Sequence, residues 1–483
     1  MLAAMASTRG GSRYDAAVVG AGPNGLAAAI VLARAGRSVA LYEANDSIGG
    51  GTRTMELTLP GYRHDICSTA HPLAVASAFF RSVSLDRHGL EFVHPEAPMA
   101  HPFDDGEALL LHRSVDETAA QMGAHDARAY RALFAPLVDD VEKLLADLVG
   151  PLRVPRHPFA DARFGLSAML SGQLLARLRF EEDRTRAFFS GVAAHSIMPL
   201  HRPATASFGL VLAMLGHAVG WPFARGGSQC IADALTAELR ALGGEVIASC
   251  DIEDVDTLPA RAVLLNLTPK QVLQVAGDRL SGRYRSALQR FRYGAGVFKL
   301  DWALDGPIPW RDPRVLQAGT VHLGGRFEEV LASEAAVGRG EHPERPFVLL
   351  TQPTLCDPSR APGGRHVGWA YCHVPNGSTV DMTERIEAQV ERFAPGFRDR
   401  ILARSVMSCA DVERYDANHV GGDINGGVQD LRQLFTRPVI RPVPYSTPDP
   451  TLYICSSSTP PGGGVHGLCG MFAAKVALRR AFR

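Results

Sequence analysis

The feature that most constrains the fold is a glycine-rich loop at 20–25, GAGPNG, set directly between a strand and a helix. The apolar run 15–19 before it predicts a buried parallel strand, and 26–35 predicts a helix that Gly36 ends. A second strand is expected at 38–42, just before Glu43. The segment therefore predicts a complete β-α-β unit of the Rossmann type.

Each glycine of this loop has a physical role in binding a dinucleotide. Gly20 permits the tight turn, Gly22 lets the backbone approach a pyrophosphate, and Gly25 lets the helix pack close to the strand. Pro23 and Asn24 begin the helix, whose N-terminus would face the phosphates. All five residues are therefore candidate cofactor contacts.

An acidic residue at the end of the second strand narrows the choice of cofactor. Glu43 lies 23 residues beyond Gly20, where a carboxylate accepts hydrogen bonds from a ribose hydroxyl. The same charge would repel a 2′-phosphate, which argues against NADP. A lone G-x-G-x-x-G is a weak signal, but the strand, helix and terminal acid together indicate a dinucleotide site.

Two further glycine turns bear on the choice between FAD and NAD. The first is GGGTR at 49–53, which would bring backbone donors and a cation against an extended dinucleotide, or is an ordinary surface loop. The second is PPGGGVHG at 460–467, between an expected strand at 451–455 and an expected helix at 468–480. Such a helix start would favour negative charge on a reduced flavin ring. The candidate contacts in these regions are Gly50, Gly51, Thr52, Arg53, Ser457, Gly463, Gly464 and Val465.

Segments along nearly the whole chain resemble the phytoene desaturase-like FAD oxidoreductases of the flavin amine oxidase superfamily. Within that family the chain is most similar to the subgroup named pyridine nucleotide-disulfide oxidoreductase domain-containing protein 2. The matching segments are YEANDSIGGGTRT, PGYRHDICSTAHPL, GWPFARGGSQCIADAL, GVFKLDWALDGPIPW, NHVGGDINGG and PPGGGVHG. The resemblance implies FAD as cofactor and isoprenoid or other lipid substrates.

The chain departs from the family pattern in two places. Family members usually carry Gly and a small residue after the last strand, where this chain has Ser at 456–458. The stretch 243–259 is short and leaves little room for the usual hairpin near the adenine. The eight cysteines include no C-x-x-C pair, so disulfide reduction and a thiolate zinc site are not expected despite the subgroup's name.

The length of 483 residues favours two joined domains. We expect an α/β protein, with a Rossmann-type FAD domain built on a parallel sheet and an inserted α+β substrate domain. The expected segments are 14–82 (first FAD-binding segment), 83–219 (mainly helical substrate or cap region), 220–290 (second FAD-binding segment), 291–404 (substrate-domain sheet and helix) and 405–483 (interface segment and C-terminal FAD-binding strand and helix).

Composition excludes several classes of function. Fifty basic and fifty acidic residues give no overall field that would attract nucleic acid. The longest apolar tract, 207–221, is too short to span a bilayer and predicts a buried helix or a wall of a substrate tunnel. Residues 1–13 lack the apolar stretch of a signal peptide. We expect a cytoplasmic protein without a metal site, with peripheral membrane contact left open.

No single residue stands out as catalytic. Among groups near recognisable motifs, His195, His466 and Asp423 are candidate proton handlers, although each is equally explained by packing or loop shaping. His217 and His419 are weaker candidates. No second G-x-G-x-x-G follows a strand, so oxygen, a quinone or another acceptor is expected to reoxidise the flavin.

The leading hypothesis is an FAD-dependent dehydrogenase or desaturase that passes a hydride from an apolar, isoprenoid- or lipid-like substrate to flavin N5. Two alternatives remain open: a flavin-dependent isomerase or ketolase, and a non-enzymatic regulatory flavoprotein. The sequence names neither the substrate nor the oligomeric state.

Overall fold

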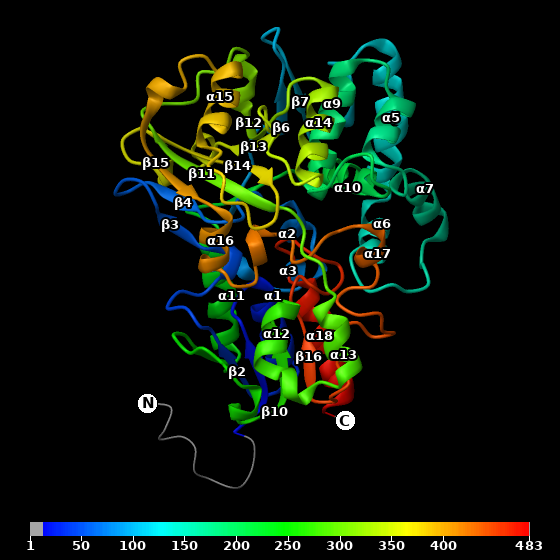
Figure 1. Cartoon of the computed structure of the whole chain (residues 1–483), viewed down its shortest axis with the longest axis vertical. Helices are drawn as coiled ribbons and strands as arrows, with labels where there is room; N and C mark the ends of the chain where they lie inside the picture. The colour runs from blue at the N-terminus through cyan, green and yellow to red at the C-terminus, as the bar shows by residue number, and fades with distance from the viewer. Residues whose placement is uncertain (1–12, 483) are drawn as a thin grey trace.

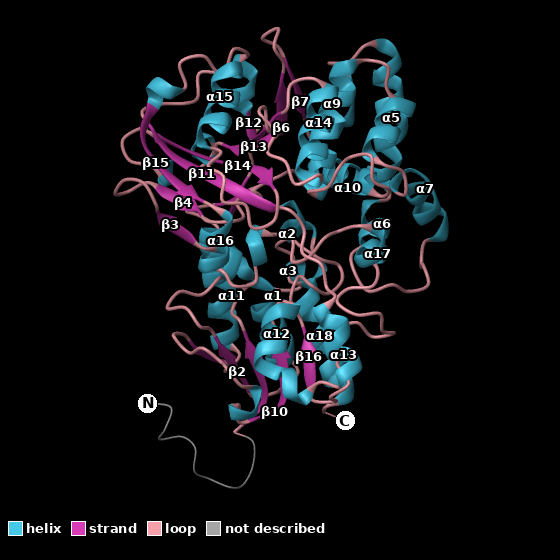
Figure 2. Cartoon of the chain, viewed as in Figure 1, coloured by secondary structure: helices cyan, strands magenta, loops and turns pink. Residues whose placement is uncertain are grey.

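The computed structural model describes residues 13–482, which form two lobes around a shared middle (Figure 1). The lower lobe carries the first and last described elements and a small parallel sheet. The upper lobe carries a larger sheet with helices beside it (Figure 2). The expectation about a signal peptide falls almost wholly on residues 1–12, outside the described residues.

The lower sheet has five strands in the order β16-β10-β1-β2-β9, all parallel. Its strands come from three separate regions of the chain. They are β1 (Tyr14–Val19), β2 (Val39–Tyr42), β9 (Glu245–Ile247), β10 (Ala260–Leu265) and β16 (Leu452–Ile454). The expected Rossmann-type fold is confirmed.

Alternate residues of β1 explain why helices cover both faces of this sheet. Ala16 and Val18 pack into a core with α1 (Pro23–Arg34), α11 (Gln229–Ala241) and α18 (Leu468–Arg480). Ala17 and Val19 pack on the other face with residues of α12 (Pro269–Ala276) and α13 (Gly282–Gln289). A strand that is buried on both faces has a continuous run of apolar residues in its sequence, as β1 has.

The upper sheet has seven strands in the order β15-β11-β14-β13-β12-β6-β7. Neighbours are antiparallel except β12 and β6, which run parallel. The strands are β6 (Ala97–Pro102), β7 (Ala108–Leu111), β11 (Gly296–Leu304), β12 (Ala318–Leu323), β13 (Val348–Thr351), β14 (His366–Val374) and β15 (Ile401–Met407).

The segment 83–219, expected to be mainly helical, also supplies strands to both the large sheet and a small ribbon. β6 and β7 close one edge of the seven-stranded sheet, and β5 (Phe92–Val93) pairs with β8 (Phe223–Ala224). Its helices are α4 (Val115–Ala119), α5 (Ala124–Asp139), α6 (Val141–Leu148), α7 (Pro158–Ala168), α8 (Gly172–Arg179), α9 (Asp183–Ala193) and α10 (Thr205–Ala218).

The remaining elements connect the lobes or cover the upper sheet. They are β3 (Thr54–Glu56), β4 (Arg63–Asp65), α2 (Pro72–Ala76), α3 (Ala78–Arg81), α14 (Phe327–Gly338), α15 (Thr383–Phe393), α16 (Cys409–Tyr415) and α17 (Leu431–Leu434). In the short stretch 243–259 the structure has only β9 and a 3₁₀ turn, Val255–Thr257. Across residues 13–482, every helix is too short or too polar to cross a bilayer.

Candidate functional site

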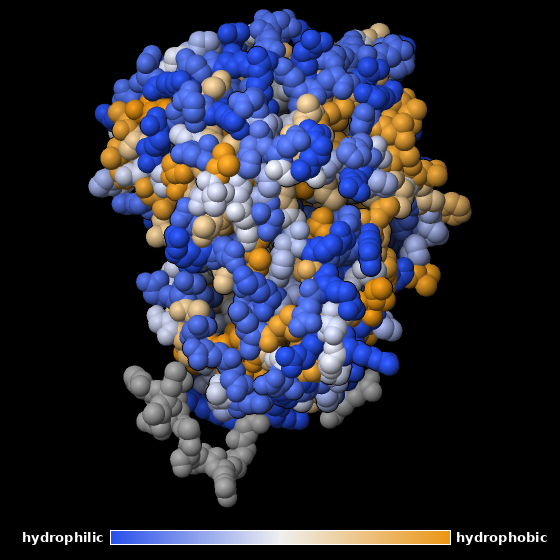
Figure 3. Space-filling view, in the orientation of Figure 1, coloured by the Kyte–Doolittle hydropathy of each residue, from blue (hydrophilic) through white to orange (hydrophobic). Residues whose placement is uncertain are grey.

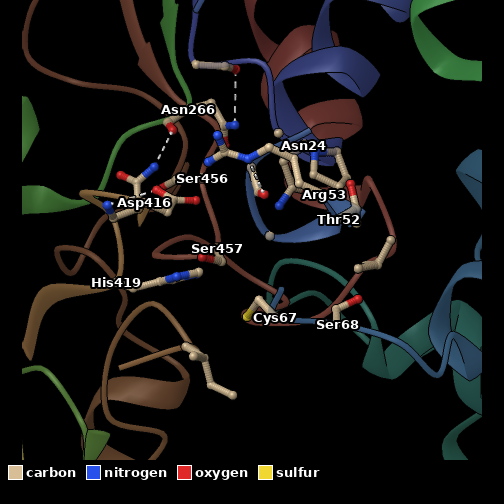
Figure 4. Close-up of a pocket in the computed structure, with 18 of the residues that line it drawn as sticks. Asn24, Thr52, Arg53, Cys67, Ser68, Asn266, Asp416, His419, Ser456 and Ser457 are labelled. Atoms are coloured by element: carbon tan, nitrogen blue, oxygen red, sulfur yellow. Dashed lines mark hydrogen bonds between the residues drawn. The ribbon is translucent and has the colours of Figure 1, made fainter. Parts of the chain in front are cut away.

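A cavity of about 750 Å³ runs from the β1–α1 loop to the upper sheet. The lower lobe lines it with Gly20, Gly22 and neighbouring residues, and the upper lobe with side chains of β12, β13 and β14. Figure 4 shows Asn24 and Arg53 on one side of this space, with Asp416, His419 and Ser457 on another. Residues far apart in the sequence therefore share one binding space.

The β1–α1 loop can be built only with glycine at its tight points. Gly20 has a φ of +94°, in the left-handed region. A Cβ on Gly25 would lie 1.9 Å from the Gly20 carbonyl oxygen. Gly22 is the N-cap of α1, and no side chain caps that helix. The N–H groups of the first turn are therefore left for a ligand, which suits an anion.

Glu43 is buried at the end of β2 and lines the cavity. Its Oε2 accepts a hydrogen bond of 2.8 Å from the Ala21 backbone N–H, and its Oε1 accepts two from Asn45. These bonds fix the carboxylate beside the glycine loop. Residues 250–253 line the same end of the cavity.

The second glycine turn packs directly on the first. A Cβ on Gly50 would lie 3.1 Å from the Gly22 Cα, so the two backbones nearly touch. Thr52 is fully buried and Arg53 is 5% exposed, which excludes an ordinary surface loop. Arg53 donates to the Gly50 and Tyr415 carbonyl oxygens and stacks 3.9 Å from the Tyr415 ring centroid.

The C-terminal glycine turn contributes fewer cavity residues than expected. Ser457, Gly464 and Val465 line the cavity. Gly463 does not, because it packs against Asn425, whose carbonyl oxygen would lie 3.0 Å from a Cβ there. Gly25 is also outside the lining and acts through close packing of the helix on the strand.

Two of the three candidate proton handlers are structural. His466 accepts from the Leu468 N–H at Nδ1 and donates from Nε2 to the Gly462 carbonyl oxygen, and burial lowers its pKa to about 4. Asp423 accepts from the N–H groups of Gly294, Asn425 and Gly427. Neither lines the cavity. The suggested catalytic roles of these two residues are therefore withdrawn: one caps α18 and the other shapes a loop.

His195 is the candidate that reaches the cavity. It lies in a 3₁₀ turn, Ala194–Ser196, and its Nε2 is 3.0 Å from the His322 Nε2 of β12. Burial lowers the pKa of His195 to about 3 and that of His322 well below its ordinary value, so both rings are neutral and one donates to the other. The ring of Trp221 packs edge-on against His195.

The weaker histidine candidates separate in the same way. His217 pairs with the Tyr130 hydroxyl, 2.8 Å away, and lies away from the cavity lining. His419 lines the cavity, and its buried Nδ1 has no partner among residues 13–482. His419 is therefore available to a ligand.

The apolar tract 207–221 contains the expected buried helix and also reaches the cavity. It forms most of the buried helix α10 and the turn after it, and Leu212 and Trp221 line the cavity. One side of the tract packs in the core, and the other contributes to the cavity wall.

Sequence reasoning missed the wall formed by the upper sheet. Leu349 and Thr351 of β13 and Trp369 and Tyr371 of β14 line the cavity, together with Thr320 of β12. Each pair is spaced by two residues, the period that brings side chains to one face of a strand. Cys67, also missed, lines the cavity as a thiol, because burial raises its pKa to about 12.

Comparisons with known proteins agree with this geometry. A family model described as an NAD(P)-binding Rossmann-like domain matches residues 18–83. The rat protein named pyridine nucleotide-disulfide oxidoreductase domain-containing protein 2 is 26% identical, over 96% of this chain and 93% of its own. A phytoene dehydrogenase of Streptomyces griseus is 28% identical, over 80% and 77%. The chain is therefore similar to phytoene desaturase-like oxidoreductases over most of its length.

Solved structures agree with the observed fold. A putrescine oxidase variant is 19% identical, with a TM-score of 0.63 over 97% of this chain and 99% of its own. An oxidoreductase from Methanosarcina mazei has a TM-score of 0.65 at 16% identity, over 95% and 99%. At such identities the likeness establishes the fold alone.

The residues at the lower end of the cavity fit a bound dinucleotide. The Gly22 and Gly50 backbones form a cradle that a Cβ at Gly50 would crowd. The buried Asn24 Oδ1 faces no partner within residues 13–482, as expected of a group that contacts a ligand. An uncapped helix N-terminus and a fixed carboxylate complete a donor and acceptor set for a pyrophosphate and a ribose.

Proposed function

We propose that the cofactor is FAD and that the enzyme is a dehydrogenase or desaturase of an apolar, isoprenoid- or lipid-like molecule. The observation that carries this proposal is the continuity of the cavity from Glu43 and the α1 N-terminus to the aromatic wall of Trp369 and Tyr371. The relatives named as phytoene dehydrogenase and phytoene desaturase support the apolar substrate class.

Specific residues of the lower lobe would hold FAD. Glu43 would accept from the adenosine ribose, and the first turn of α1 would bind the pyrophosphate. Cys67, Ser457 and Val465, which line the same cavity, would contact the isoalloxazine part of the cofactor. Bound there, the flavin would supply an acceptor for a hydride.

The chain's own residues would orient the substrate and take up a proton. Trp221, Leu349, Trp369 and Tyr371 present apolar surface that would exclude water. Loss of a hydride and a proton from neighbouring carbons leaves a double bond in the substrate. His195, hydrogen-bonded to His322, is our candidate to accept that proton transiently and pass it on, because its low pKa prevents it from retaining the proton, and His322 is its positioning residue.

Anaerobic mixing tests this function. The flavin absorbance of the purified protein should bleach when it meets an oxidisable isoprenoid or long-chain lipid, and it should return when oxygen or a quinone is admitted. If a full panel of such donors leaves the flavin oxidised, the dehydrogenase proposal falls. His195→Asn should slow bleaching and change its pH profile, whereas His217→Asn, away from the cavity, should not.

The same experiment separates the two alternatives. An isomerase would require reduced flavin at the start and would consume no acceptor. A regulatory flavoprotein would give no turnover with either redox state. Net product formation coupled to acceptor reduction would exclude both.

A further inference from the structure

Three polar residues lie side by side on the sheet wall of the cavity. Thr320 of β12 pairs in register with Thr351 of β13, which pairs with Trp369 of β14. All three line the cavity and are buried, with exposed fractions of 1%, 1% and 5%. They form a short row, named here the polar row.

Each member of the polar row carries a polar atom without a partner. Thr320 Oγ1, Thr351 Oγ1 and Trp369 Nε1 have no hydrogen bond within residues 13–482. A buried donor left unpaired is costly, so three neighbours in this state indicate a missing ligand. The other three tryptophans of the chain each donate from Nε1, to Leu212, Glu387 and Gln352 respectively.

The chemistry of the row specifies what it binds. An indole N–H only donates, and threonine hydroxyls can donate too, so the ligand atom must be an acceptor. Lys299, whose Nζ lies 5.6 Å from the Trp369 ring centroid, is paired with Asp301. The neighbouring His322 is neutral. No net positive charge is available there, among the described residues, to balance a carboxylate.

We propose that the polar row binds an uncharged oxygen acceptor, a carbonyl or ester group, on an otherwise apolar substrate. This inference rests on the proposed function, because it assigns the same cavity a substrate with one polar end. It replaces a pure hydrocarbon with an oxygenated lipid or isoprenoid as the preferred ligand.

A matched ligand series tests the proposal in the flavin-loaded protein. The probes are a long-chain methyl ketone, an alkene of the same length and the corresponding carboxylic acid, each titrated while the visible flavin spectrum is followed. The ketone should bind at least about tenfold more tightly than either relative. Thr320→Val with Thr351→Val should remove that preference and leave alkene binding unchanged. Trp369→Phe should weaken ketone binding more than alkene binding, because it removes the indole N–H.

Several results would overturn it. The proposal fails if the alkene binds as tightly as the ketone, if the carboxylate binds most tightly, or if no member of the series binds. Thr236→Val is the matched control and should keep the ketone preference, because it also removes a buried hydroxyl without a partner in residues 13–482 but lies outside the cavity lining. Flavin bleaching by a hydrocarbon donor, with no ketone preference, would remove this inference while leaving the dehydrogenase function standing.

A second and independent observation concerns the outer surface of the helical region. Phe159, Val154 and Leu166 are 89%, 87% and 80% exposed, although they are large and apolar. Figure 3 shows apolar side chains gathered along the right edge of the molecule, where Figure 1 places α5 and α7. The set, named here the apolar face, comprises Leu148, Leu152, Val154, Phe159, Leu166, Met169, Leu174 and Leu178.

Cations lie among the residues of the apolar face. Residues 148–179 contain five arginines and one acidic residue, Asp161, but Arg153, Arg163 and Arg177 are paired with acidic residues outside the segment. Arg156 and Arg179 are exposed and form no salt bridge within residues 13–482. Exposed apolar side chains interleaved with cations are typical of surfaces that enter the headgroup region of anionic membranes.

The position of the apolar face links it to the cavity. Its helices α7 and α8 pack on α10, whose Leu212 lines the cavity wall. Pairing of two copies through this face would bury the unpaired Arg156 and Arg179 of both copies without an acidic partner on the face, which disfavours a symmetric dimer. We infer that the apolar face docks on an anionic lipid bilayer, independently of which substrate the enzyme uses.

Vesicle flotation tests the docking inference. The purified full-length protein should float with vesicles of equimolar phosphatidylcholine and phosphatidylglycerol, and much less with phosphatidylcholine alone or in high salt. Phe159→Ser with Leu166→Ser should abolish flotation, and each of Arg156→Gln and Arg179→Gln should weaken binding about fivefold.

A matched pair of exposed apolar residues elsewhere gives the control. Leu402 and Val406 of β15 are 42% and 41% exposed, and their serine variants should float like the unchanged protein. Equal flotation of the apolar-face variants, or no flotation of the unchanged protein, would contradict the inference. So would a stable dimer that Phe159→Ser with Leu166→Ser dissolves.

Discussion

Gly470→Ala probes the point where the two ends of the chain meet. Gly470 lies in α18, which packs on α1. A Cβ there would lie 1.8 Å from the Asn24 carbonyl oxygen, about 1.6 Å short of the 3.4 Å at which ordinary contact begins. It would also lie 2.9 Å from the Ala28 backbone nitrogen. Because these are backbone atoms, the helices themselves must move apart.

The size of the effect follows from two opposing contributions. Overpacking a core costs about 1–3 kcal/mol, and overlap with a main chain belongs at the upper end of that range. Alanine in place of glycine inside a helix stabilises by about 1 kcal/mol. The net loss should be about 2 kcal/mol, and because Asn24 begins α1 at the cavity, flavin retention should fall as well.

Calorimetry and flavin content measure both consequences. The melting temperature of Gly470→Ala should fall by a few degrees, and the purified variant should carry less flavin per chain. Gly165→Ala in α7 is the matched control, since a Cβ at that helical position meets nothing within 4 Å. That variant should be as stable as the unchanged protein or more so. If Gly470→Ala melts no lower than Gly165→Ala and keeps its flavin, the packing argument is refuted.

Three further predictions concern buried charge and the cofactor carboxylate. Burial lowers the pKa of His71 and His101 from 6.5 to about 4, so the stability that these neutral rings contribute is complete above pH 6.5 and is lost as the pH falls towards 4. The melting temperature should therefore fall steadily between pH 6.5 and pH 4. A flat profile over that interval would contradict the burial of these two histidines in the neutral form. Arg360 lies 2.6 Å from the buried Asp65, so Arg360→Gln leaves that carboxylate without its cation. The free energy of unfolding, measured in urea, should fall by about 3–5 kcal/mol. A fall of less than about 1 kcal/mol, typical of an exposed pair, would show that the pair is not buried in solution. Glu43→Gln removes the charge that accepts from the Ala21 N–H, and should weaken FAD binding about tenfold in apoprotein titrations without lowering the affinity for free riboflavin.

The sequence predicted well where the structure is locally specified. The glycine loop, the two flanking strands and the acid at Glu43 all act within one β-α-β unit, and their pattern is legible because sequence neighbours are spatial neighbours. The helix expected at 468–480 is observed as α18 (Leu468–Arg480). Caps and glycines mark such boundaries directly.

Long-range pairing is where the sequence was least informative. β6 pairs with β12 across more than two hundred residues, and the run ALLL of β7 is too short to distinguish a strand from a buried helix. His466 is a candidate in the sequence because it lies beside the C-terminal glycines. In the structure both of its ring nitrogens are already hydrogen-bonded, one to the Gly462 carbonyl and one to the Leu468 N–H. The polar row joins three strands, so no local pattern could have revealed it.

The cofactor that the purified protein carries is the most direct test of the central claim. The protein should be yellow, and denaturation should release about one FAD per chain, with the visible spectrum restored when FAD is added back to the apoprotein. A colourless protein that gains no flavin spectrum on incubation with FAD, or one that releases NAD instead, would contradict the account.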